Sequence, residues 1–229
     1  MSLNNQVAAI DEADNPAGAI SLIAEQVADI EAQIKKCLAL FTNQNEIGKW
    51  CKGILGIGPV IAAGLFAHID IAKAKSAASI WRFAGLDPTQ TWEKGKSRPW
   101  NADLKGLCWN IGECFVKVSG NPKSLYGRLY KERKAAEVKL NDEGAFREQV
   151  TKALARRKYG QSTEVYKAHA AGKLPKAHIH ARAKRYAVKM FLSHYWEALY
   201  FFTYHKEAPP PYIIVFGGHK DYISWKEAI

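Results

Sequence analysis

The sequence predicts an all-α protein, and three observations carry this prediction. Apolar residues recur at spacings of three and four along most of the chain, which is the period of one helix face. Glycine and proline fall between these periodic stretches, where they end helices, as in Gly85-Leu86-Asp87-Pro88. The hydrophobic fraction of 48% and the 7 Trp of this 229-residue chain support a folded core. We expect one helical domain without internal repeats.

The first expected element is a long amphipathic helix over 17–41, within an N-terminal segment at 1–46 whose start is polar. A narrow seam of apolar residues at helical spacing is typical of a coiled coil or a helix bundle. The seam consists of Ile20, Ile23, Val27, Ile30, Ile34 and Leu38. It predicts a contact within the core or between two copies of the chain, that is, a homodimer through helix 17–41.

A break at 43–45 leads to the most distinctive stretch, a predicted helix-hairpin-helix over 47–67. In Leu55-Gly56-Ile57-Gly58-Pro59 the glycines allow a tight turn, and the proline suits the first turn of the next helix. The amides of Gly58, Val60 and Ile61 would lie at a helix N-terminus, which attracts phosphate. The pattern therefore predicts contact with a nucleic-acid backbone at Gly56, Ile57, Gly58 and Val60. The alternative is a glycine-proline turn between two core helices, with no ligand.

The helical domain is expected to extend over 47–208. Further helices are expected at about 76–84, 104–118, 124–140, 145–158 and 175–202. Asn101 or Asp103 is suited to cap the second of these. The loop at 89–103 lacks periodicity and carries Trp92 and Trp100, which either stack on unpaired bases or anchor the loop to the core. Pro209-Pro210-Pro211 begins a tail at 209–229, in which Tyr212–Phe216 is a short strand or an extended arm.

The charge of the chain points to a polyanionic partner. Its formal net charge is +11 and its pI is about 9.4. Nucleic acid fits this charge better than a membrane, because no segment pairs a strong apolar face with a dense basic face. We expect DNA, duplex or branched, with structured RNA as the alternative. The basic candidate contacts are Lys94, Lys96, Arg98, Arg156, Arg157, Lys158, Lys176, Arg182, Lys184 and Arg185.

Residues suited to metal or redox chemistry are sparse in this sequence. Asp70, Asp87 and Asp103 have no spacing that requires a two-metal site. His178 and His180 point to different sides of a helix, so they are not expected to share a metal ion. We therefore predict no metal and no cofactor. The 4 cysteines form no Cys-x-x-Cys pair, and no signal peptide or membrane span is evident, which predicts a cytoplasmic protein with free thiols.

One known family shares the pattern over 53–96. The hairpin at 53–65, the following His68-Ile69-Asp70, the helix ending at Gly85-Leu86-Asp87-Pro88 and the pair Gly95-Lys96 resemble the C-terminal transposase domain of the IS-one-ten family of insertion-sequence transposases. A looser resemblance extends over 17–200 and places a coiled coil before the hairpin. The resemblance implies a helical DNA-binding domain used in recombination, joined in the family to an N-terminal RuvC-like nuclease domain.

The chain departs from that family in two ways. Too few residues precede the hairpin to form the nuclease domain. The family's reactive serine is replaced by Lys94, which cannot form a phosphoserine link, and Ser97 is the remaining candidate nucleophile. We therefore expect a DNA-backbone binder that is not catalytic alone. Two alternatives remain: a transposase or recombinase subunit that acts with a separate nuclease chain, and an RNA-binding or protein-interaction module of a mobile element.

Overall fold

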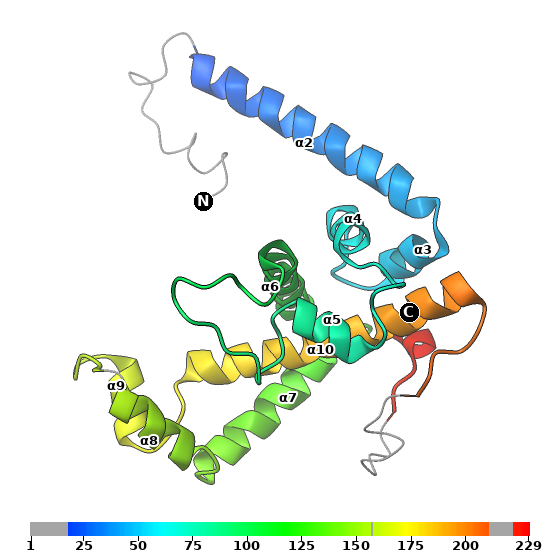
Figure 1. The fold of residues 1–229 in the computed structure, drawn as a ribbon. Coiled ribbons are helices and arrows are strands. Elements are labelled where there is room, and N and C mark those ends of the chain that lie inside the picture. The colour runs from blue at the N-terminus through cyan, green and yellow to red at the C-terminus, as the bar shows by residue number, and fades with distance from the viewer. Residues whose placement is uncertain (1–17, 157, 211–221) are drawn as a thin grey trace.

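The centre of the fold is its longest helix, α10 (Lys176–Tyr204), which crosses behind the other helices in Figure 1. The structure is a computed structural model and describes residues 18–156, 158–210 and 222–229. The middle of α10 is buried, its last turn is half-buried to exposed, and its first turns carry most of its charged residues. Among the helices of these ranges, none combines the length and the apolar character needed to cross a bilayer.

The other helices pack around α10 or join the elements that do. Throughout the described ranges the chain forms helices and connecting turns with no strand, so the predicted all-α fold is confirmed. The predicted ends of the helices agree with the observed ones to within a few residues. The helices before α10 are α2 (Ala19–Asn43), α3 (Glu46–Gly53), α4 (Pro59–His68), α5 (Ala77–Phe83), α6 (Ala102–Lys117), α7 (Leu125–Asp142), α8 (Arg147–Arg156) and α9 (Glu164–Ala170).

Local side chains fix where several of these helices begin. Asn101 accepts a hydrogen bond from the Leu104 amide at 2.8 Å and so caps α6, as the sequence predicts. Thr163 accepts from the Tyr166 amide at 3.2 Å and caps α9. That helix was not among those predicted from the sequence, which had none between 158 and 175.

An aromatic cluster joins α6, α7 and α10. The rings of Phe115 and Tyr126 stack with their centroids 4.8 Å apart, and Phe191 meets them edge-on at 5.5 and 5.3 Å. Aromatic pairs at these separations stabilise a core beyond their buried area. The cluster therefore holds α6 and α7 against α10.

The C-terminal residues complete the core instead of trailing from it. A short 3-10 helix, η3 (Trp225–Ala228), buries Trp225 against α3 and the end of α10. The indole of Trp50 on α3 donates a hydrogen bond to the Trp225 carbonyl at 3.2 Å. We expected the tail at 209–229 to lie outside the helical domain, but η3 packs within that domain. The possible strand at Tyr212–Phe216 lies outside the described residues.

Helix α2 leaves the body of the protein at one end of the hairpin (Figure 1). Its C-terminal part packs on α3 and α4, where Phe41 meets Phe66 edge-on at 6.1 Å. Towards the N-terminal end of the helix, Ile23, Ile30 and Ile34 are each more than half exposed. The predicted apolar seam therefore remains largely uncovered on the described part of the chain.

Candidate nucleic-acid interface

The predicted helix-hairpin-helix is present. Helix α3 ends at Gly53, and the Ile57 amide donates to the Ile54 carbonyl at 3.0 Å to close the turn. Gly56 has φ +94°, a left-handed conformation that favours glycine, and a Cβ there would lie 3.4 Å from Cys114 on α6. Pro59 takes the first position of α4. The hairpin is thus both tightly turned and packed against α6.

The start of α4 presents its backbone to solvent. Gly58 is exposed, and a Cβ built on it would meet nothing within 4 Å. In the described part of the chain, no acceptor receives a hydrogen bond from the amides of Gly58, Val60 or Ile61. Ile57, in contrast, is buried and its amide already donates to the Ile54 carbonyl, so it is not placed to hold an anion as predicted. The amides of Gly58, Val60 and Ile61 are therefore available to an anion, as expected of a helix N-terminus.

A shallow hollow of about 90 Å³ adjoins this end of α4. Lys52 lines it from α3, while Thr42 and Asn43 line it from the end of α2. The last carbonyls of α2 carry partial negative charge, which opposes the attraction of an anion to the α4 amides. The hairpin alone is therefore a weak anion site, and a stronger positive potential has to come from side chains elsewhere.

The basic loop between α5 and α6 is ordered by its two tryptophans in different ways. The Trp92 indole donates to the Lys96 carbonyl at 2.7 Å, and its side chain stays 43% exposed. Trp100 lies against Gly85, whose Cβ would sit 2.8 Å from the ring. Of the two roles considered for these residues, anchoring applies to Trp100, whereas Trp92 is held within the loop and remains accessible.

The three loop cations predicted as contacts are all exposed, and one of them is already paired. Within the described ranges Lys94 has no carboxylate partner. Lys96 forms an ion pair with Glu93 at 2.8 Å, and Arg98 lies 5.7 Å from the centre of the Trp92 ring. Ser97 is exposed, and in the described structure no hydrogen bond reaches its hydroxyl. The arrangement gives Ser97 none of the activation that a serine nucleophile needs.

Unpaired cations gather where this loop meets α5, α6 and α10. We call them the cation patch: Arg82, Arg98, Lys105, Arg185 and Lys189. Partial burial lowers the pKa of Lys105, and the nearby Arg98 and Arg185 lower it further. Burial also lowers the pKa of Lys189, to which Arg185 adds. None of the five lies within 4.0 Å of a carboxylate in the described residues.

Asp87 is a nearby acid that responds to this positive field. Its pKa lies below the usual range, first because the Thr89 amide and hydroxyl donate hydrogen bonds to it. The positive charges of Arg82 and Lys189 lower the pKa further. Asp87 offsets part of this positive field, but the five cations outnumber it, and like-charged groups held close together attract an anion.

Two of the predicted contacts on α10 are occupied by carboxylates, which corrects that part of the prediction. Arg182 Nε donates to Glu137 at 2.6 Å, and Glu137 also pairs with Arg133 at 2.6 Å. Lys184 is buried and pairs with Glu113. Both cations use their charge to neutralise acids on α7 and α6, so they are structural residues. Arg185, the residue after Lys184, is exposed and belongs to the cation patch.

The remaining predicted contacts lie far from the hairpin. Arg156, Lys158 and Lys176 are exposed near α8, at the opposite end of the molecule from α3 and α4 in Figure 1, and Arg157 lies outside the described residues. The hairpin and the cation patch are also separate. Gly56 packs on Cys114, whereas Lys105 is nine residues earlier on α6, which is two and a half turns and hence the opposite side.

Sequence reasoning missed Arg82, Lys105 and Lys189 because it followed runs of basic residues. A helical projection of 102–117 would have shown Lys105 and Trp109 on one exposed face, four residues apart. Lys189 carries a second signal, since its ammonium lies 4.2 Å from the centre of the Trp81 ring.

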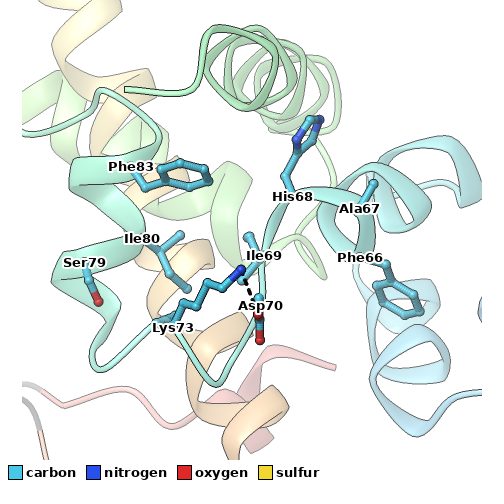
Figure 2. A pocket seen from close by; sticks show the side chains of 10 residues that line it. Phe66, Ala67, His68, Ile69, Asp70, Lys73, Ser79, Ile80 and Phe83 are labelled. Atoms are coloured by element: carbon cyan, nitrogen blue, oxygen red, sulfur yellow. Dashed lines mark ion pairs between the residues drawn. The ribbon is translucent and has the colours of Figure 1, made fainter. Parts of the chain in front are cut away.

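A separate hollow of about 650 Å³ lies between the end of α4 and α5 (Figure 2). Its walls are mainly apolar, with Phe66 and Phe83 on opposite sides and Ile80 at the base. Lys73 and Asp70 form an ion pair at 3.5 Å at its edge. Across the described ranges, no group of three or more His, Cys, Asp or Glu could hold a metal ion.

Comparison of the chain with models of known families, with curated proteins and with solved structures finds no match. The function is therefore argued from the geometry and charge of the chain itself.

Proposed function

We propose that this protein binds the DNA backbone through the cation patch, with the hairpin as a second contact, and that it does not cut strands by itself. The observation that carries the proposal is the grouping of five cations that have no carboxylate within 4.0 Å among the residues the structure describes. Cations that neutralise phosphates release condensed counterions, which makes such binding strong at low salt and independent of sequence. The resemblance to a transposase domain supports the same partner.

The rest of the molecule is in keeping with a DNA-binding role inside the cell. Its cysteines are free thiols, and Cys51 and Cys108 are buried, which raises the pKa of each to about 12. Thiols of this kind are inert and suit a reducing, cytoplasmic compartment. The unactivated hydroxyl of Ser97 supports binding without strand transfer.

A salt titration of duplex binding tests the proposal. For the wild type we expect log K to fall linearly with log salt concentration. The double variant Lys105→Ala/Arg185→Ala removes two patch cations, so the slope should become shallower by about 1.8. The matched control is Lys36→Ala/Lys123→Ala, which removes two exposed charges from α2 and from the α6–α7 turn. The control should keep the wild-type slope.

Two results would contradict the proposal. One is a binding constant that does not change with salt. The other is an equal loss of slope in the patch variant and in its control, because net charge would then explain binding without a defined site. Structured RNA serves as a third ligand, and a preference for it of more than about tenfold, or 1.4 kcal/mol, would assign the patch to RNA instead of DNA.

We further propose that α2 pairs with α2 of a second copy. The exposed seam that contains Ile23, Ile30 and Ile34 repeats at coiled-coil spacing, and an equivalent helix covers such a seam best. The variant Ile30→Glu/Ile34→Glu places charge in the seam and should yield a monomer by sedimentation. Ala32→Glu, on the opposite face of α2, should leave the dimer intact. A wild type that sediments as a monomer would contradict this proposal.

A further inference from the structure

A groove of about 310 Å³ opens within the cation patch, between the α5–α6 loop and the start of α6. Its lining alternates aromatic and basic side chains: Trp92, Arg98, Trp100, Ala102 and Lys105. No acidic side chain is among them. The groove therefore offers flat π surfaces and positive charge together, a combination that backbone binding alone does not require.

The two indoles of the groove are held differently. The glycine at 85 covers one face of Trp100, and the Lys105 ammonium lies 4.0 Å from the centre of its ring. These two contacts hold Trp100 in place as a wall of the groove. Trp92 is fixed by its hydrogen bond to the Lys96 carbonyl, while its ring remains 43% exposed. Arg98 lies 5.7 Å from the centre of this ring, so a ligand ring would stack on the part that Arg98 leaves open, without displacing any core residue.

The exposed aromatic surface continues along α6. Trp109 lies four residues after Lys105, one turn further on the same side of the helix, and is 60% exposed. The Lys184 ammonium lies 4.9 Å from the centre of its ring. A strand that leaves the groove along α6 would meet a second indole next to a cation.

We propose that this groove binds an unpaired nucleobase of DNA, stacked on Trp92, with the adjoining phosphate held by Arg98 and Lys105. In a duplex both faces of each base are covered by its neighbours, so an indole can stack only on a base that has left the helix. Nucleic acids are the polyanions that carry a flat π system on every unit. The inference rests on the proposed function and narrows it to DNA that contains single-stranded or distorted segments.

The site selects for the unpaired state rather than for sequence. Its polar groups are cations and a loop carbonyl that is already bonded to Trp92. None of them is placed to distinguish one base edge from another, and every base has a π face. The protein should therefore bind runs of any base that lack strong secondary structure.

The test compares a labelled oligothymidine with a blunt duplex of equal phosphate number, by fluorescence anisotropy at fixed salt. Trp92→Ala should weaken oligothymidine binding by about tenfold, the size of the contribution of one base–aromatic stack. Duplex binding should weaken by less than about twofold. Trp92→Phe keeps an aromatic ring but loses the bond to Lys96, and should retain most of the affinity. The matched control is Tyr204→Ala, which removes an aromatic side chain that is also 43% exposed, at the far end of α10.

The outcomes separate this inference from the proposed function. If the wild type binds neither ligand in a salt-dependent way, both fail. If duplex binding keeps its salt slope but Trp92→Ala leaves oligothymidine binding unchanged, or weakens both ligands equally, only the stacking site fails. A loss with Trp92→Phe as large as with Trp92→Ala would assign the effect to loop shape and overturn the stacking site. Oligouridine is the last ligand. If Trp92→Ala weakens the binding of oligouridine but not of oligothymidine, the assignment to DNA is overturned.

Discussion

Replacement of Arg182 by Met is expected to lower the free energy of unfolding by about 3 kcal/mol, the range found when one partner of a buried ion pair is removed. The Glu137 side chain is only 1% exposed and receives hydrogen bonds from Arg182 at 2.6 and 3.2 Å. Arg133 would remain as its single cationic partner. Urea unfolding at neutral pH, followed by far-UV circular dichroism, measures the loss.

Arg185→Met is the control, three residues further along α10. Its side chain is exposed and has no carboxylate partner among the described residues, so the stability should change by less than about 0.5 kcal/mol. The same variant should flatten the salt dependence of DNA binding, whereas Arg182→Met should leave it unchanged under conditions where both are folded. If Arg182→Met unfolds at the wild-type urea concentration and weakens DNA binding, then Arg182 is a DNA contact after all.

The same ion pairs predict acid sensitivity. Burial raises the pKa of Glu137, but the hydrogen bonds from Arg182 and Arg133 outweigh it, so the pKa lies below its usual range. A carboxylate of this kind stabilises the fold above its unfolded pKa of about 4.3. That contribution is lost as the pH falls through the lower, folded value.

His194 is expected to make the fold about 3 kcal/mol less stable at pH 4 than at pH 7. Burial lowers the pKa of this side chain to about 4, from its usual 6.5, and the Tyr126 hydroxyl lies 2.8 Å from its Nδ1. Between these two values the unfolded chain binds a proton that the folded chain does not, so stability falls as the pH falls. A shift of this size corresponds to about 3 kcal/mol.

His194→Gln isolates this contribution, because glutamine does not titrate and can still pair with Tyr126. Unfolding by urea from pH 7 to pH 4.5 should give a clearly flatter stability profile for the variant than for the wild type. Glu197 on the same helix has a pKa raised by burial, so its contribution to stability runs in the opposite direction with pH. Since Glu197 is present in both proteins, the difference between the two profiles reports on His194. Parallel profiles would show that His194 is accessible to protons in the folded state.

The sequence predicted the helices well because each boundary is set locally. Asn101 caps α6 with its own side chain, Gly56 adopts a left-handed turn, and Pro59 begins α4. These features depend on residues within one helical turn of each other. The docking of Trp225 was not predicted, since it depends on a partner, Trp50, that lies 175 residues away in the chain.

The candidate site was predicted only in part, for an electrostatic reason. A sequence shows how many cations a segment has, but the carboxylates that neutralise them come from other helices. Glu137 on α7 and Glu113 on α6 neutralise Arg182 and Lys184, while the neighbouring Arg185 has no carboxylate partner among the described residues. Lys105 and Lys189 join Arg185 only because α6 and α10 lie side by side.

The contact between Trp50 and Trp225 also sets when this protein can finish folding on the ribosome. At about 5–20 residues per second, the 175 residues that separate the two side chains take roughly 10 to 35 s to synthesise. The rings of Phe191 and Tyr195, which also cover Trp50, are made late in the same interval. Throughout it the nascent chain displays a large apolar indole on its first short helix, which is the kind of surface that chaperones bind.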